Sequence, residues 1–457
     1  MNFRKFVKTL AILTFVLTSC SDDDCNLDHN SNQLGLPVLK QGTFPEGDVN
    51  LNIGDTYIYS PEVVSNGDIY YQWYLNDKDM GTDKKLVVEA NTSMRSKLVL
   101  ELTNDNGTIV LENKVIVSGA NYSGKYIVLN EGWFGHEPGN VTILNPENNT
   151  VQQWVFRDQN YGATLGVTSQ SATLWNDKLY ICSKDNIHLT VVDPKTMYVE
   201  KQSGKILGSR QAYEFIGINE KYGVLTANGD LYRVDLETLE AEQILMSDGW
   251  NGTGSGIVYN NKLLINVKGK KLHVLDIDKV LGDLSQYSYT KYFPFETLDI
   301  QTTGGCRFVK GNDGNLYTVE SSSTGNNLVR IKPDFTLEKK TMRPDYSPSS
   351  FGFYREAMFC GNASGDKFYY VARGKIYKST FDNASPETPF TSYSKSGYSF
   401  YGAAVRVNPY NNEVVAMYLT DDYKQNLLVR FNGDTGEMIS ETSYEGYYFL
   451  ATFIFVK

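Results

Sequence analysis

The chain has 457 residues, and at about 150 residues per domain this length suggests three domains, or one large β domain and a small one. Aromatic residues make up 13% of the chain, which excludes a disordered protein. The 53 acidic residues exceed the 43 Lys and Arg, giving a net charge of −10. This disfavours binding to nucleic acid, because phosphate contacts need a surplus of basic side chains.

The first twenty residues have the pattern of an export signal. Basic residues at positions 4, 5 and 8 precede an apolar segment at 10–17 (LAILTFVL). That segment is far shorter than the roughly 20 residues of a membrane-spanning helix. The sequence LTSC at 17–20 resembles a bacterial lipobox, so we expect residues 1–19 to be a lipoprotein signal peptide and Cys20 to carry the lipid. The alternative is an ordinary secretory signal followed by an incidental cysteine.

Residues 20–35 are polar and predict a flexible, acidic tether. The sequence SDDD at 21–24 resembles the surface-export signal of Bacteroidota lipoproteins. The resemblance implies a protein that is anchored to the outer membrane by lipid and faces the cell exterior. The alternative reading of SDDD is a solvated linker.

Residues 36–120 predict a small β-sandwich, because short strand patterns alternate with turn signals. Trp73, in the strand pattern YYQWYL, precedes an Asn-Asp turn and resembles the core tryptophan of immunoglobulin-like or PKD-like sandwiches. No pair of cysteines lies nearby, which excludes a disulfide-bridged core. Cys182, Cys306 and Cys360 are far apart in the sequence, and we expect buried free thiols.

Residues 121–457 contain a repeat of a strand, a turn and another strand. The turns recur at intervals of 41 to 56 residues, which suits the four-stranded blade of a β-propeller. Seven units are visible, with turns at Asn145, Asp193, Asp235, Asp276, Lys332, Thr380 and Asn432.

The first and last parts of this repeat region complete each other. The first unit lacks an initial strand, and residues 449–456 (FLATFIFV) form a single strand pattern with nothing after it. Pairing the two would close a ring and remove its exposed edges. We therefore predict an all-β protein, with an Ig/PKD-like sandwich followed by a seven-bladed propeller closed by the C-terminal strand. The alternative fold, a long array of β-sandwiches, would not explain why the first unit lacks a strand and the last segment supplies one.

A ligand site is expected on one face of the propeller. The loops that lead into the innermost strands share this face with the loops between second and third strands. Their aromatic rings could stack on a flat ligand, while amide and guanidinium groups fix its orientation. The alternative is that small residues let the blades converge and aromatic rings plug the channel. The candidate ligand-binding residues are Glu131, Trp133, Phe134, His136, Gln170, Arg210, Tyr213, Trp250, Asn251, Phe351, Tyr354, Arg355 and Tyr401.

Signals for catalysis are weak. The sequence contains no H-E-x-x-H, G-x-S-x-G or P-loop motif. Glu131 and His136 share a loop and are the one pair that could exchange protons, but no second carboxylate accompanies them. We therefore expect a binding protein rather than an enzyme, with no cofactor or metal.

Residues 127–132 (IVLNEG) and 139–142 (GNVT) are the stretches that most resemble a known group. They are similar to uncharacterised Bacteroidota lipoproteins in which a PKD-like domain precedes a YVTN/YncE-like propeller. Some related surface propellers capture cobalamin and pass it to a TonB-dependent outer-membrane transporter. The resemblance implies capture of a cobalamin-like corrinoid or another bulky nutrient. The alternatives are an adhesion or scaffold protein that binds a protein or glycan partner, and a propeller-type lyase or hydrolase.

Overall fold

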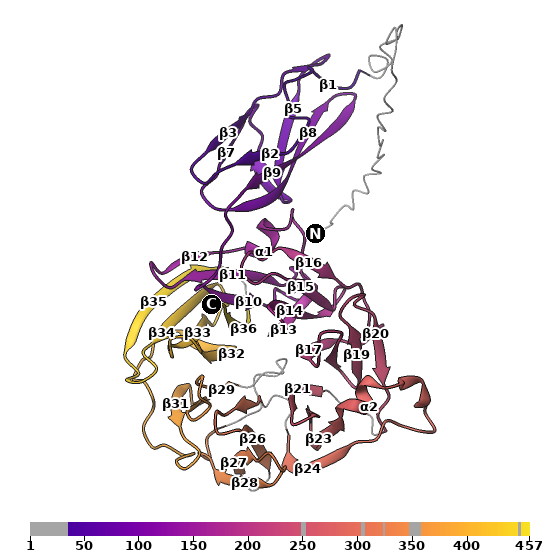
Figure 1. The fold of residues 1–457 in the computed structure, drawn as a ribbon. Helices are drawn as coiled ribbons and strands as arrows, with labels where there is room; N and C mark the ends of the chain where they lie inside the picture. Colours follow the sequence, from indigo (N-terminus) through magenta and orange to yellow (C-terminus); the bar gives the residue numbers. More distant parts are fainter. Residues whose placement is uncertain (1–34, 248–252, 303–306, 323–324, 347–357, 447–448) are drawn as a thin grey trace, which may run out of the picture.

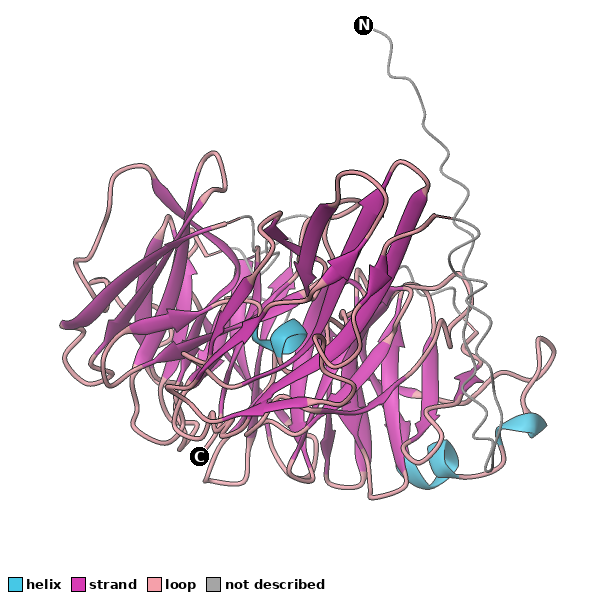
Figure 2. Cartoon of the chain, turned by 90° about the horizontal axis from the view of Figure 1, so that it is seen from above, coloured by secondary structure: helices cyan, strands magenta, loops and turns pink. Residues whose placement is uncertain are grey.

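Nearly all of the regular structure is β-strand, as the sequence predicts (Figure 2). The computed structural model describes residues 35–247, 253–302, 307–322, 325–346, 358–446 and 449–457. In this part of the chain, no helix is long and apolar enough to cross a membrane. The helical segments are short: α1 (Val155–Asp158), α2 (Ile277–Leu281) and η2 (Leu284–Gln286).

The N-terminal strands form a sandwich around Trp73. Its ring is fully buried, and its Nε1 donates a hydrogen bond of 2.8 Å to the Asp83 carbonyl. A five-stranded sheet, in the order β2-β9-β8-β5-β6, packs with the pairs β3-β7 and β1-β4. The strands are β1 (Val38–Leu39), β2 (Val49–Leu51), β3 (Thr56–Tyr59), β4 (Val63–Val64), β5 (Tyr70–Leu75), β6 (Lys78–Gly81), β7 (Leu86–Glu89), β8 (Met94–Asn104) and β9 (Gly107–Val117).

The remaining strands form seven sheets arranged as the blades of a ring (Figure 1). Six sheets have four strands, and the sheet β29-β30-β31 has three among the described residues. From the axis outward, the first blade consists of β36 (Leu450–Phe455), β10 (Tyr126–Asn130), β11 (Asn140–Asn145) and β12 (Thr150–Gln152), and the second of β13 (Val167–Trp175), β14 (Lys178–Asp185), β15 (Leu189–Val192) and β16 (Val199–Gln202). The third blade consists of β17 (Ala212–Gly217), β18 (Tyr222–Ala227), β19 (Leu231–Asp235) and β20 (Ala241–Ile244). The fourth consists of β21 (Thr253–Tyr259), β22 (Lys262–Val267), β23 (Lys271–Asp276) and β24 (Glu296–Gln301).

The other three blades complete the ring in chain order. The fifth blade consists of β25 (Val309–Lys310), β26 (Leu316–Ser322), β27 (Gly325–Ile331) and β28 (Leu337–Thr341). The sixth consists of β29 (Phe359–Gly361), β30 (Phe368–Ala372) and β31 (Lys375–Ser379). The seventh consists of β32 (Tyr398–Val407), β33 (Val414–Thr420), β34 (Gln425–Phe431) and β35 (Met438–Glu445). In the predicted units, the turn residues lie at the end of the third strand of each blade or directly after it.

The turn residues show why the repeat is visible in the sequence. Asp193 Oδ1 accepts a hydrogen bond of 2.7 Å from the Lys195 backbone N–H, two residues on. Asp235, Asp276 and Asn432 make the same contact with the residue two positions later, at 2.8 to 3.0 Å. Short polar side chains are favoured here because they bond the backbone of a tight turn.

The C-terminal strand closes the ring as predicted. β36 pairs antiparallel with β10, with Tyr126 opposite Phe455 and Val128 opposite Phe453. All six residues of β36 and all five of β10 are buried. Most residues of these two strands are apolar because both strand faces pack against neighbouring blades. The innermost strand of the first blade therefore comes from the opposite end of the chain.

The sandwich contacts the propeller beside α1, at the outer part of the first blade (Figure 1). Gln159 is fully buried there, and its Nε2 donates to the Ser93 carbonyl at 2.6 Å and to the Tyr122 hydroxyl at 3.0 Å. Arg157 donates to the Asn76 carbonyl and forms an ion pair of 3.2 Å with Asp77. The buried bonds of Gln159 and the more exposed contacts of Arg157 together fix the sandwich against the ring.

The free thiols follow the prediction where the structure describes them. Cys182 and Cys360 are buried and unbridged. Burial raises the pKa of the Cys360 thiol to about 11, so it is protonated at neutral pH. Cys306 and the predicted lipid-carrying Cys20 lie outside the described residues.

Candidate functional site

The loop between β10 and β11 presents aromatic side chains at the face where the innermost strands begin, here called the start face. This loop turns back on itself: the Trp133 N–H donates to the Glu137 carbonyl at 3.0 Å, and the His136 N–H donates to Trp133 at 2.8 Å. Trp133 is 40% exposed and Phe134 is 69% exposed. The His136 ring stacks on Trp133, with centroids 3.9 Å apart. The loop therefore holds its aromatic rings in place, and we call Trp133, Phe134 and His136 the platform.

Gly132 allows the tight return of this loop. Its φ of 80° lies in the left-handed region, which glycine adopts without strain. A Cβ atom at this position would lie 2.2 Å from the Pro138 carbonyl oxygen. The glycine is needed for both reasons.

Beneath the platform, the Glu131 carboxyl is buried where three blades meet. Its Oε1 accepts a hydrogen bond from Gln170 of β13, and its carboxyl also bonds the Tyr401 hydroxyl of β32. Its backbone N–H donates to the Phe449 carbonyl at 2.8 Å, directly before β36. The first, second and last blades thus converge on one carboxyl group.

Burial raises the pKa of Glu131 to about 8, although the positive charge of Lys184 and the bonds from Gln170 and Tyr401 lower it. Burial disfavours the charged form of a carboxyl group. The group is therefore mostly protonated at neutral pH and can donate as well as accept a hydrogen bond. Burial, followed by the negative charge that Glu131 carries once it ionises, also raises the pKa of the Tyr401 hydroxyl.

Three aromatic side chains lie in contact with one another beside the Glu131 carboxyl group. Tyr401, Tyr423 and Phe449 contact one another, with ring centroids 5.4 to 6.3 Å apart. Tyr423 is 46% exposed and lies between β33 and β34. We call Glu131, Trp133, Gln170, Tyr401, Tyr423 and Phe449 the start-face cluster.

Three predicted loop residues lie instead inside innermost strands, which corrects their assignment. Gln170, Tyr213 and Tyr401 belong to β13, β17 and β32. Each sits where the strand register shifts, between residues 169 and 171, 212 and 214, or 400 and 405. A bulge leaves a residue outside the regular ladder and changes the direction of its side chain. These residues interrupt the strand pattern without ending the strand, so the sequence suggested loops.

The other candidates do not join the cluster in the described structure. Arg210 precedes β17 and forms an ion pair of 2.6 Å with Asp230. Tyr213 is buried, and its hydroxyl donates to Gln211 Oε1 at 3.2 Å. Five candidates lie outside the described residues: Trp250, Asn251, Phe351, Tyr354 and Arg355.

Tyr423, Phe449 and Lys184 lie at or near this site but were not among the predicted residues. Tyr423 is the one aromatic residue in a polar loop (DDYKQN), which was a usable signal. Phe449 was counted as part of the closing strand, and it precedes β36 with a left-handed φ of 49°. Lys184 gave no signal, because only the packing of the second blade brings its charge near Glu131.

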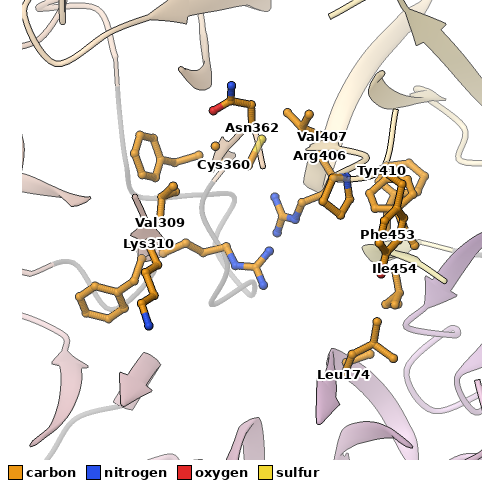
Figure 3. A pocket seen from close by; sticks show the side chains of 17 residues that line it. Leu174, Val309, Lys310, Cys360, Asn362, Arg406, Val407, Tyr410, Phe453 and Ile454 are labelled. Atoms are coloured by element: carbon orange, nitrogen blue, oxygen red, sulfur yellow. The ribbon is translucent and has the colours of Figure 1, made fainter. Parts of the chain in front are cut away.

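The axial channel of the ring contains two further cavities of about 360 and 340 Å³. Together their walls include residues from, or directly before, all seven innermost strands. Arg406 of β32 is 4% exposed, and Figure 3 shows its guanidinium group directed into the pocket. The predicted ligand-binding residues are absent from the described linings of these two cavities. The start-face cluster is therefore separate from the channel interior.

Comparison with known proteins supports the fold. A family described as "Domain of unknown function (DUF5074)" matches residues 123–456, which span the propeller. A quinoprotein alcohol dehydrogenase-like protein from Bacteroides thetaiotaomicron has a similar structure, with a TM-score of 0.69 and 24% identity over 92% of this chain and 99% of that one. Virginiamycin B lyase from Staphylococcus aureus is more distant, with a TM-score of 0.44 and 12% identity over 77% of this chain and 96% of that one. The chain matches no curated protein.

Proposed function

The chain belongs to the DUF5074 family of domains of unknown function, and we propose that it is a non-catalytic protein that binds a bulky ligand at the start-face cluster. One observation carries the proposal: a group of aromatic rings, of which Trp133 and Tyr423 are exposed, adjoins a carboxyl group buried among three blades. Such sites combine large apolar contact with a few fixed polar groups, which is typical of small-molecule binding.

The arrangement favours binding over proton transfer. The Glu131 carboxyl bonds Gln170 and Tyr401, and the ring of His136 stacks on Trp133. The two residues that could have formed an acid and base pair therefore have separate structural roles. A protonated carboxyl group held in place by neighbours can orient a ligand through one donor and one acceptor.

A cobalamin-like corrinoid is the ligand class that we favour. Its broad ring system offers apolar surface to the exposed rings of Trp133 and Tyr423, and burying apolar surface stabilises a complex by about 25 cal/mol per Å². Its peripheral amides can pair with the Glu131 carboxyl group. The resemblance of residues 127–132 to propeller lipoproteins supports the same choice.

We further propose that the protein is anchored to the outer membrane by lipid on Cys20 and passes its ligand to a TonB-dependent transporter. The lipobox and the acidic residues 21–24 support this location. Replacing Cys20 with Ala should move the protein from the membrane fraction to the soluble fraction. An unchanged distribution would contradict anchoring through this residue.

Calorimetric titration of residues 21–457 with cobalamin tests the binding proposal. Trp133→Ala should weaken binding about tenfold, because it removes an exposed aromatic plane, and a central aromatic contact is worth about 1–2 kcal/mol or more. Tyr289→Ala is the matched control, since Tyr289 is 76% exposed and lies on the distant segment between β23 and β24. Absence of cobalamin binding would reject the corrinoid, and equal affinities for the two variants would reject the site.

A further inference from the structure

A further concavity lies on the face opposite the start-face cluster, here called the end face. It is a groove of about 820 Å³ between the first two blades and the turn after β32. Trp175 and Tyr410 supply aromatic surface to it. Leu174 lines the groove and both axial cavities, so the groove adjoins the channel at this side chain. We call it the end-face groove.

The walls of the end-face groove are fixed by contacts that do not depend on a ligand. The segment between the sandwich and β10 crosses this edge: the Tyr122 N–H donates to the Lys195 carbonyl at 2.6 Å, and the Gly124 N–H donates to the Val456 carbonyl at 2.9 Å. Lys178 of β14 and Glu200 of β16 form an ion pair that spans β15, the strand between them. The groove is therefore already formed in the free protein.

The aromatic residues of the groove have different environments. Trp175 is half-buried and lies over Gly217, where a Cβ atom would come within 2.1 Å of the indole ring. Its Nε1 donates to the Asn219 carbonyl at 3.4 Å. Tyr410 is 54% exposed, in the turn between β32 and β33. A rigid indole and a freer phenol thus border the same space.

The charged side chains of the groove balance. Three carboxylates and three ammonium groups line it: Asp177, Asp193, Glu200, Lys178, Lys195 and Lys457. A charged ligand would be attracted by the groups of opposite charge and repelled by those of like charge. A neutral ligand rich in hydroxyl groups can donate to the carboxylates and accept from the ammonium groups.

From these observations we propose that the end-face groove binds a neutral oligosaccharide. The apolar faces of sugar rings suit the aromatic surfaces of Trp175 and Tyr410, while the hydroxyl groups suit the mixed donors and acceptors. The volume lies within the range of about 300–1,000 Å³ for small-molecule sites. This site is independent of the start-face cluster and uses none of its residues.

Calorimetric titration of residues 21–457 with maltotetraose, mannotetraose, cellotetraose and chitotetraose tests the proposal, with tetragalacturonate as the anionic comparison. We expect at least one neutral oligosaccharide to bind and tetragalacturonate to bind at least tenfold more weakly. Failure of all four neutral probes, or a preference for the anionic one, would overturn the proposal.

Variants then locate the binding site. Tyr410→Ala should weaken the bound oligosaccharide about tenfold, and Trp175→Phe, which keeps a ring over Gly217, should weaken it less. Tyr289→Ala should have no effect. Saturation with cobalamin should leave the oligosaccharide affinity unchanged, which separates this site from the start-face cluster. Competition with cobalamin, or equal affinities for Tyr410→Ala and Tyr289→Ala, would place the sugar elsewhere.

Discussion

A chain that ends at Gly446 should fail to fold to a stable ring, because it lacks β36. The strand contributes four large buried side chains, Leu450, Phe453, Ile454 and Phe455. Losing one such side chain in a core costs about 2–5 kcal/mol. The sum, about 8–20 kcal/mol for four side chains, is as large as the roughly 5–15 kcal/mol that stabilises a typical domain. β10 would also lose its partner and present an open strand edge, which favours aggregation.

The measurement is thermal unfolding by circular dichroism together with the soluble yield. Removal of Lys457 alone is the matched control, because this residue is exposed and follows the strand. The control should unfold like the full-length chain. A chain ending at Gly446 that unfolds cooperatively at the same temperature would show that ring closure contributes little.

Stability should fall as the pH rises from 5 to 9, because of Glu131. Its pKa is about 8 in the folded protein, against an ordinary value of 4.5. Between these values the folded state keeps a proton that the unfolded state has released, so stabilisation is present at low pH and is lost as the pH rises through 8. At about 1.4 kcal/mol per pKa unit, the loss is on the order of 3–5 kcal/mol. The positive charge of Lys184 lowers the pKa of Glu131, and the value of about 8 already includes this effect.

Glu131→Gln should remove this dependence, since an amide cannot ionise. Urea unfolding at pH 5, 7 and 9 should show similar stability for both proteins at pH 5 and a more stable variant at pH 9, by about 3 kcal/mol. Glu46→Gln, at an exposed position in the sandwich, should keep the slope of the natural protein. If the free energy of unfolding falls with pH equally in Glu131→Gln and the natural protein, Glu131 is not the group that keeps a proton in the folded state.

Local chemistry explains how much of the fold was predictable. The side chains of Asp193, Asp235 and Asp276 must bond the backbone of tight turns, so the positions of the third strands could be read from the sequence. The unmatched strand at 449–456 had only one place to pair, which gave the closure with β10. Trp73 lay in an alternating pattern that required a buried face.

The candidate site was predictable only in part. Glu131, Trp133 and His136 share one loop, so their proximity followed from the chain itself. Gln170 and Tyr401 were selected as loop residues, whereas bulges in β13 and β32 place them in strands. The end-face groove gave no signal, because Trp175 ends β13 and Tyr410 lies in the turn after β32, more than 200 residues away.

The sequence by itself determined the all-β class, the seven repeated units and the strand that joins the two ends of the propeller. These features depend on alternation of apolar residues and on turn chemistry, which act over a few neighbouring residues. Only the tertiary structure decided that Glu131 is buried with a raised pKa, and that Trp175 and Tyr410 line one groove together with charged side chains of both signs. Burial and charge at a point in space depend on which blades meet there, and that information is spread over the whole ring.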